Sequence, residues 1–284
     1  MALSQVGVAI HKPTAETILR TIAQVEAAGV PMVWLTTGAG PDALTVFASA
    51  AASTRFVRMG TAIVPTLPRH PLVVAQQAAD IAQLAPGRFV LGLGPSHAAV
   101  MEGRYGIPYR QPLGHLREFV TVVKGLLTGA QTDFEGKHFK VHAKLNYGAQ
   151  VPIIISALRA TSFELAGEIS EGAVTWLCPA AYLRDAALPA LERGAARRGR
   201  ARPKLIAHAF LALTSDPAEL QQGVDEFLPV YPRLTQLSGD VRGRWLSRGA
   251  ARRLVDRHAR CRRAARDRRS MSQEAGELHA HFWL

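Results

Sequence analysis

The sequence predicts an α/β fold, a TIM (β/α)8 barrel in which the eighth unit is not recognisable. Seven short apolar runs rich in β-branched residues alternate with seven longer segments of helical periodicity, as in βα units around a parallel sheet. The runs are almost continuously apolar, as expected for strands covered on both faces. After Pro232 the alternation stops, and no eighth strand is evident.

Each predicted strand is followed by a predicted helix. The strands are residues 6–10, 32–36, 57–64, 89–94, 153–157, 173–178 and 205–213. The first helix opens at Pro13 and Thr14 and ends before Gly29, where a C-terminal cap is expected. The other helices are residues 43–52, 71–84, 113–127, 160–169, 182–198 and 217–228. The spacing of apolar residues predicts one buried stripe on each helix.

A long insertion, residues 95–150, separates the fourth strand from the fifth. Connections in βα units usually have two to six residues. The insertion contains the helix 113–127, a turn at Thr128 and Gly129, and a hairpin-like segment around Gly136. In a barrel it would rise from the C-terminal face, where active sites lie. It is therefore expected to form a wall of the pocket.

The charge distribution divides the chain into a barrel, residues 1–232, and an arginine-rich tail, residues 233–284. The formal net charge is +12, and the tail contributes +8 of it through 13 arginines and five acidic residues. Such a run is typical of solvated helix or disorder, and its abrupt start also suggests a shifted reading frame. A barrel without its eighth unit would leave two open parallel edges and expose the first strand.

Several classes of protein are excluded or not expected. No apolar run approaches the roughly 18 residues of a membrane span, so a transmembrane protein is excluded. The N-terminus lacks the basic region of a signal peptide, which predicts a cytoplasmic protein. Cys178 and Cys261 are the only cysteines, so neither a disulfide framework nor a multi-cysteine zinc site is available. No metal site is expected.

A set of short motifs carries a family resemblance. They are Gly60-Thr61-Ala62-Ile63, Arg69-His70-Pro71, Gln76-Gln77, Gly87-Arg88-Phe89 and Gly92-Leu93-Gly94, with further matches at Asp42-Ala43-Leu44-Thr45, Tyr105-Gly106, Arg117-Glu118-Phe119, Phe134-x-Gly136 and Ser156-Ala157-Leu158. In this combination the chain, from about residue 4 to about residue 231, resembles the luciferase-like family of flavin and deazaflavin oxidoreductases.

The resemblance implies a barrel of the bacterial-luciferase-like type that holds an isoalloxazine-type ring at its C-terminal face. The Ser96-His97 and Tyr105-Gly106 variant is similar to the actinobacterial branch that uses coenzyme F420, so F420 is expected, with FMN as the alternative. The implied function is hydride transfer between F420 and a small organic substrate with an activated C=C bond, a carbonyl or an alcohol. With FMN it would be a monooxygenase. A homodimer is expected.

The resemblance also implies residues that bind the cofactor. Ala62 and Ile63 match a bulge that supports one face of the ring, often through a cis peptide bond that does not involve proline; an ordinary trans strand end is the alternative. The loop that contacts the cofactor side chain matches Gly94, Pro95, Ser96 and His97. The turn that meets the phosphate end matches Ala157, Leu158 and Arg159, although Arg159 is also compatible with a solvated helix end.

Proton transfer is assigned to histidines. His97 matches the position of a catalytic acid in some relatives, although it is equally suited to capping the following helix. Thr36 and Thr37 stand where many F420 enzymes of the family have Asp-His, so a proton-transfer role falls to His11, His97 or the substrate. Thr36 keeps a place in the expected cofactor site. His70 is expected to cap the helix that starts at Pro71.

Two other classes of function stay open. One alternative is an inactive variant of the family with an incomplete barrel. In the other, the tail binds nucleic acid or an anionic membrane through its arginines. Nucleic acid and membrane are not expected as partners, because aromatic residues that stack on bases are sparse in the tail.

Overall fold

The computed structural model describes residues 6–210, 216, 218, 219, 222 and 281–283. The chain divides into two compact units, one made of residues 1–211 and 280–284 and the other of residues 212–279. Apart from a few positions, the predicted helix 217–228 and the arginine-rich tail up to residue 280 lie outside the described residues. The fold below is that of the first unit.

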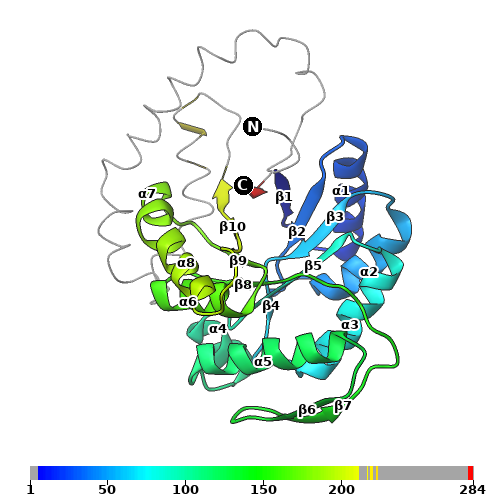
Figure 1. The fold of residues 1–284 in the computed structure, drawn as a ribbon. Helices are drawn as coiled ribbons and strands as arrows, with labels where there is room; N and C mark the ends of the chain where they lie inside the picture. Colours follow the sequence, from blue (N-terminus) through cyan, green and yellow to red (C-terminus); the bar gives the residue numbers. More distant parts are fainter. Residues whose placement is uncertain (1–5, 211–215, 217, 220–221, 223–280, 284) are drawn as a thin grey trace. The chain divides into compact units, whose positions relative to one another are not determined.

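Strands and helices alternate along the first unit, as predicted (Figure 1). The strands are β1 (Gly7–Ile10), β2 (Met32–Leu35), β3 (Arg58–Thr61), β4 (Val64–Pro65), β5 (Phe89–Gly94), β6 (Thr132–Glu135), β7 (Lys140–Ala143), β8 (Ile153–Ser156), β9 (Gly172–Val174), β10 (Lys204–Ile206), β11 (His208–Phe210) and β12 (His281–Trp283). The helices are α1 (Ala15–Ala27), α2 (Ala43–Ser53), α3 (Pro71–Leu84), α4 (Ala98–Tyr105), α5 (Pro112–Leu127), α6 (Ala160–Ile169), α7 (Ala180–Tyr182) and α8 (Leu188–Ala196). A π-helical turn, η2 (Leu183–Ala187), joins α7 to α8.

The main sheet has the order β10-β9-β8-β5-β3-β2-β1-β12-β11, and every pair from β10 to β1 is parallel. Parallel neighbours joined through helices are the arrangement that the sequence predicts. The predicted strand 57–64 is divided into β3 and β4, and the predicted strand 205–213 is divided into β10 and β11. Each break lies inside an apolar run. The apolar pattern alone therefore predicts one continuous strand where the structure has two.

The edge of β1 is covered, contrary to the expectation of two open parallel edges. Residues 281–283 form β12, which pairs antiparallel with β1 on one side and with β11 on the other. The expectation that no strand follows residue 232 is therefore wrong. Strand pairing uses main-chain groups, so a segment of three residues, too short for a periodic pattern, can satisfy an edge. The family's expected eighth position is taken here by an antiparallel strand.

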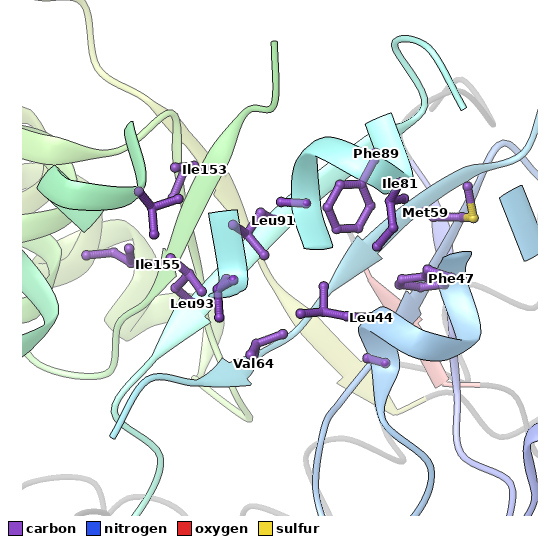
Figure 2. Close-up of a cluster of buried hydrophobic side chains, with 14 of the residues drawn as sticks. Leu44, Phe47, Met59, Val64, Ile81, Phe89, Leu91, Leu93, Ile153 and Ile155 are labelled. Carbon is purple, nitrogen blue, oxygen red and sulfur yellow. The ribbon is translucent and has the colours of Figure 1, made fainter. Parts of the chain in front are cut away.

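Two buried clusters lie on the two sides of the sheet. The larger one fills the space between strands and helices, and Figure 2 shows Phe47, Met59, Phe89 and Leu91 from this layer. The smaller cluster lies inside the curved sheet and contains Trp34, Ala62, Val90, Ile154 and Val174, from five different strands or strand ends. Because both faces are covered, the strands are apolar throughout, as predicted.

Trp34 fills much of the interior because its strand neighbours are glycines. A Cβ atom at Gly7 would lie 2.6 Å from Trp34 Nε1, and one at Gly60 would overlap the six-membered ring of the indole. Gly7 and Gly60 lie on β1 and β3, the strands on either side of β2. Trp34 is buried in the core, where it is 5% exposed.

Helix starts follow the predicted capping chemistry. The Thr14 side chain accepts a hydrogen bond from the Thr17 N–H at the start of α1, and Asp42 does the same for Thr45 in α2. His70 caps α3, as predicted, because its Nδ1 accepts from the Leu72 N–H at 3.2 Å. Gly29 follows α1 with a left-handed φ of +73°.

The insertion contributes α4, α5 and the β6–β7 hairpin. The hairpin packs along α5, where a Cβ atom at Gly125 would lie 2.9 Å from Thr132 Cγ2, and its turn is held by Glu118 of the same helix (Figure 1). The hairpin contacts α5 and, through Phe139, also His70 at the start of α3. The loop 95–97 and α4 follow β5 directly. This part of the insertion therefore starts at the carboxyl ends of the strands.

Within the described residues, no helix has the length and apolar character needed to cross a bilayer. In the same part of the chain, no group of three or more His, Cys, Asp or Glu side chains is placed to hold a metal ion.

Candidate active site

The break between β3 and β4 lies at the carboxyl end of the sheet. The peptide bond between Ala62 and Ile63 is cis, as the family resemblance implied. At this break the Thr61 side chain replaces ladder bonds, since its Oγ1 accepts from the Gly92 N–H at 2.7 Å and donates to the Gly92 carbonyl at 2.9 Å. Ala62 is buried and the Ile63 side chain is partly exposed, so an apolar surface forms at the strand end.

Three hydrogen bonds from the end of β2 hold this break. The Ala62 N–H donates to the Leu35 carbonyl at 2.7 Å, and the Thr37 N–H donates to the Ile63 carbonyl at 3.2 Å. The Thr36 hydroxyl donates to the Ala62 carbonyl at 2.6 Å. Thr36 therefore supports the backbone at Ala62 and Ile63. The sequence alone did not indicate this role, which depends on the contact between the ends of β2 and β3.

Gly94 brings three strand ends close together. A Cβ atom at this position would lie 3.1 Å from Ile63 Cγ1 and would overlap the hydroxyl of Ser156, the last residue of β8. The Gly94 carbonyl also accepts from the Thr66 N–H at 2.9 Å. Because Gly94 has no side chain, Ile63 and Ser156 can both lie close to its backbone.

The loop after β5 leads directly into α4. Pro95 is buried, and Ser96 has a φ of +62°, in the left-handed region that few residues other than glycine adopt. The Tyr109 hydroxyl donates to the Ser96 carbonyl at 2.9 Å. His97 occupies the N-cap position of α4, yet within the described residues its side chain makes no capping hydrogen bond to that helix. The interpretation of His97 as a cap is therefore not supported.

The turn after β8 is bonded within the chain. Ala157 is buried, and its N–H donates to the Val174 carbonyl at 3.0 Å. The N–H groups of Leu158 and Arg159 both donate to Ser162 Oγ, at 3.1 and 3.0 Å. Arg159 is exposed at the N-cap position of α6. An anion at this turn would meet the Arg159 guanidinium and the first amides inside α6.

The opposite side of the strand ends carries aromatic rings. Trp176 follows β9 and stacks on His208 of β11, with ring centroids 4.2 Å apart and an angle of 7° between the planes. Trp176 is partly exposed and packs against the inner cluster. His11 follows β1 directly and is exposed. Burial raises the pKa of the nearby Cys178 thiol to about 11, so the thiol stays protonated at neutral pH.

Sequence reasoning missed a buried pair behind Gly94. Thr66 is fully buried, and its Oγ1 lies 3.4 Å from His115 Nδ1 in α5. Burial, and secondly the neighbouring His138, lower the pKa of His115 from its ordinary value of 6.5 to about 4. The signal was present in the sequence, because His115 lies on the same helical stripe as Phe119 and next to Leu116, both fully buried.

An ion pair joins two loops at the same end of the sheet. Arg69 Nη2 contacts the Asp42 carboxylate, which also caps α2. Arg69 belongs to the segment between β4 and α3. Both residues belong to motifs that carried the resemblance, and the structure gives them a supporting role beside the site.

Residues 1–284 match the model of the family described as luciferase-like monooxygenase. The chain belongs to the luciferase-like monooxygenase family. The match extends beyond residue 231, where the resemblance of the sequence motifs ends. It is consistent with β12, which brings residues 281–283 into the same sheet as β1.

Several relatives of this luciferase-like chain carry F420 in their names. One relative is Rv3520c of Mycobacterium tuberculosis, named as a putative coenzyme F420-dependent oxidoreductase. The two chains are 32% identical over a region that covers 74% of this chain and 66% of the relative. This chain is also 32% identical over 64% of its length, and 56% of the relative, to the F420-dependent glucose-6-phosphate dehydrogenase of Beutenbergia cavernae. The chain spans between half and two thirds of these and similar curated relatives.

Solved luciferase-like structures share the fold. The F420-dependent tetrahydromethanopterin reductase of Methanopyrus kandleri has a TM-score of 0.67 at 20% identity, covering 88% of this chain and 81% of the other. An FMN-bound neighbour is the oxygenating constituent of 3,6-diketocamphane monooxygenase from Pseudomonas putida, with a TM-score of 0.55 at 19% identity, covering 75% and 66%. At these identities the likeness establishes the fold, the luciferase-like barrel that the sequence predicted.

Proposed function

We propose that this protein is an F420-dependent oxidoreductase that transfers a hydride between the deazaflavin and a small organic substrate, either an activated C=C bond, a carbonyl or an alcohol. The observation that carries the proposal is the meeting of Ala62, Ile63 and Gly94 with Ser156 at the carboxyl end of the sheet. In parallel barrels this end holds the active site. The F420-dependent relatives support the choice of cofactor.

The residues present fit a flat ring system. Ile63 and Trp176 offer partly exposed apolar surface, and both pack against the inner cluster that contains Ala62. Ser96 lies on the adjacent rim with a partly exposed side chain. The first amides of α4 and α6 have no carbonyl within their own helices to bond, so both helix starts favour the anionic part of a cofactor, and Arg159 adds a positive charge at α6.

Bound F420 would supply a carbon centre that gives or accepts a hydride. The protein would hold the ring against Ile63 and Gly94, orient the substrate over it and exclude water. His97 and His11 are the residues proposed to hold or move a proton on the substrate, because an imidazole ring can both donate and accept a proton. Thr36 is not a proton donor to substrate in this scheme, since its hydroxyl donates to the Ala62 carbonyl.

An FMN-dependent monooxygenase is the alternative function, supported by the FMN-bound structural neighbour. An inactive variant of the family is the second alternative. We further propose a homodimer as the assembled form, a cytoplasmic location, and no role for nucleic acid or membrane. The partly exposed Trp176, which stacks on the buried His208, would contact the substrate.

A titration of the purified full chain with F420 and, separately, with FMN tests the proposal. Cofactor fluorescence and retention on a desalting column report binding. Saturable binding of F420 at micromolar concentration, with little binding of FMN, is the expected result. Preference for FMN would replace hydride transfer by oxygen chemistry. Binding of neither cofactor by a folded protein would refute the proposed function and favour the inactive variant.

A further inference from the structure

The turn of the β6–β7 hairpin, residues 136–139, is fixed to α5 by one carboxylate. Glu118 accepts the N–H groups of Lys137, His138 and Phe139 at 3.0, 2.7 and 3.1 Å. Burial raises the pKa of Glu118, but these hydrogen bonds outweigh it and lower the pKa below its usual value. A Cβ atom at Gly136 would overlap the same carboxylate. This segment is called the tip below.

The tip covers His115. The Phe139 ring lies 4.9 Å from the His115 ring and the His138 ring lies 5.5 Å away, both measured between centroids. Phe139 also meets the edge of His70, the cap of α3, at 6.0 Å. With these rings above it and Phe119 of its own helix beside it, His115 is only 8% exposed. The burial of His115 therefore depends on where the tip sits.

His115 in turn contacts the support of the strand ends. Its Nδ1 lies 3.4 Å from Thr66 Oγ1, and the Thr66 N–H donates to the Gly94 carbonyl at 2.9 Å. Thr66 directly follows β4 and is fully buried. A continuous line of contacts thus runs from the tip through His115 and Thr66 to Gly94.

We propose that the hairpin tip is a positioning element of the cofactor site and that Glu118 is the positioning residue that holds it. With the tip in place, His115 stays dry and Thr66 stays fixed against Gly94. With the tip released, water reaches His115, the contact with Thr66 loosens, and Gly94 loses part of its support. This inference rests on the proposed function, because it takes Gly94 as part of the surface that receives the ring.

The state of the tip can be measured without any cofactor. Burial is the largest cause of the low pKa of His115, and the proximity of His138 is the second; Glu118 acts in the opposite direction. Release of the tip removes the first two effects. The pKa of His115 is therefore expected to rise from about 4 toward its ordinary value when the tip is released.

The chain offers a matched control for Glu118. Glu26 Oε1 accepts the N–H groups of Arg55, Phe56 and Val57 at 2.9, 2.7 and 3.0 Å, at the segment that enters β3. Glu118→Gln and Glu26→Gln each remove one charge from a carboxylate that bonds three main-chain amides. Only Glu118 lies on the line of contacts to Gly94.

Two measurements on the full-length variants decide the proposal: histidine side-chain titration by NMR, and the dissociation constants for F420 and FMN at pH 7. Glu118→Gln is expected to raise the pKa of His115 and to weaken binding of the preferred cofactor about fivefold to tenfold, a usual size for coupling between linked sites. Glu26→Gln is expected to change neither. Phe139→Ala, which leaves the Glu118 hydrogen bonds available, is expected to act like Glu118→Gln and serves if that variant does not fold.

Equal effects of Glu118→Gln and Glu26→Gln on both quantities would overturn the proposal. A raised pKa of His115 with unchanged cofactor affinity would overturn the link from Thr66 to Gly94 while leaving the cover over His115 in place. If the wild-type protein binds neither F420 nor FMN, the proposed function fails. The His115 titration still decides separately whether Glu118 holds the tip.

Discussion

A methyl group added at Gly60 would enter space that the Trp34 indole already occupies. A Cβ atom there would lie 2.6 Å from Met32 Cε and would overlap two carbon atoms of the indole. Trp34 packs inside the curved sheet between the strands that carry Gly7 and Gly60, so the ring has little room to move. Overpacking of this kind costs about 1–3 kcal/mol. We expect Gly60→Ala to lower the free energy of unfolding by this amount, in the upper part of the range.

Urea denaturation at 25 °C measures the change as a shift of the midpoint at unchanged slope. Trp34→Phe removes the ring atoms that the new methyl group meets, so the double variant Trp34→Phe/Gly60→Ala should lose less than the sum of the single variants, by about 1 kcal/mol or more. Gly103→Ala is the control, since a Cβ atom there meets nothing within 4 Å. Additive effects of the two substitutions would refute the packing of Trp34 against Gly60.

Three further predictions concern the site, its buried histidine and the covered edge. Gly94→Ala is expected to abolish cofactor binding, and the double variant Gly94→Ala/Ser156→Gly should regain thermal stability without regaining binding; recovery of both would show that Gly94 matters only for packing against Ser156. Because the pKa of His115 is about 4 in the folded protein and 6.5 in the unfolded chain, the unfolded chain binds the proton first. The stabilising contribution of neutral His115 is therefore complete above pH 6.5 and is lost as the pH falls to 4, by at most roughly 3 kcal/mol. In denaturant melts between pH 4 and 7, His115→Gln should flatten this part of the stability profile, and an unchanged profile would contradict the assignment. Phe282→Pro removes a main-chain N–H from β12, which lies between β1 and β11, and hydrogen exchange at Val8 should become faster than in Phe282→Val. Equal exchange in the two variants would contradict the pairing.

The sequence predicted the parallel strands and their helices because both faces of each strand are apolar and the helix stripes have a clear period. It did not predict β12, because three residues are too few to carry a periodic signal, even though two of them are aromatic. The resemblance predicted the cis bond between Ala62 and Ile63, whereas the supports of that bond, Thr36 and Thr61, are visible only in the structure. Their contacts join residues that are 26 and 31 positions apart.

The contacts of the hairpin could not be predicted for a related reason, and its expected place in a pocket wall stays a prediction. An insertion after a barrel strand starts at the C-terminal face, but its later residues follow whichever surface offers partners, and here the partners are on α5. A glutamate in a helix has no sequence feature that tells whether it meets water or the amides of a distant turn. The same holds for His115, whose burial depends on Phe139 from that turn.

Two threonine hydroxyls, of Thr36 and Thr61, and the main-chain N–H of Thr66 explain how the sheet tolerates a strand break at the candidate site. A break leaves buried main-chain groups without ladder partners, which is costly unless other groups replace them. Thr61 supplies both a donor and an acceptor to Gly92, Thr36 supplies a donor to the Ala62 carbonyl, and the Thr66 N–H restores a bond to Gly94. A hydroxyl group can rotate to donate or accept, and the branched Cβ of threonine still fits a strand. The backbone at Ala62 and Ile63 thereby leaves the ladder while the Ala62 N–H and the carbonyls of both residues stay bonded, and the proposed function uses the apolar surface at this place to receive the ring.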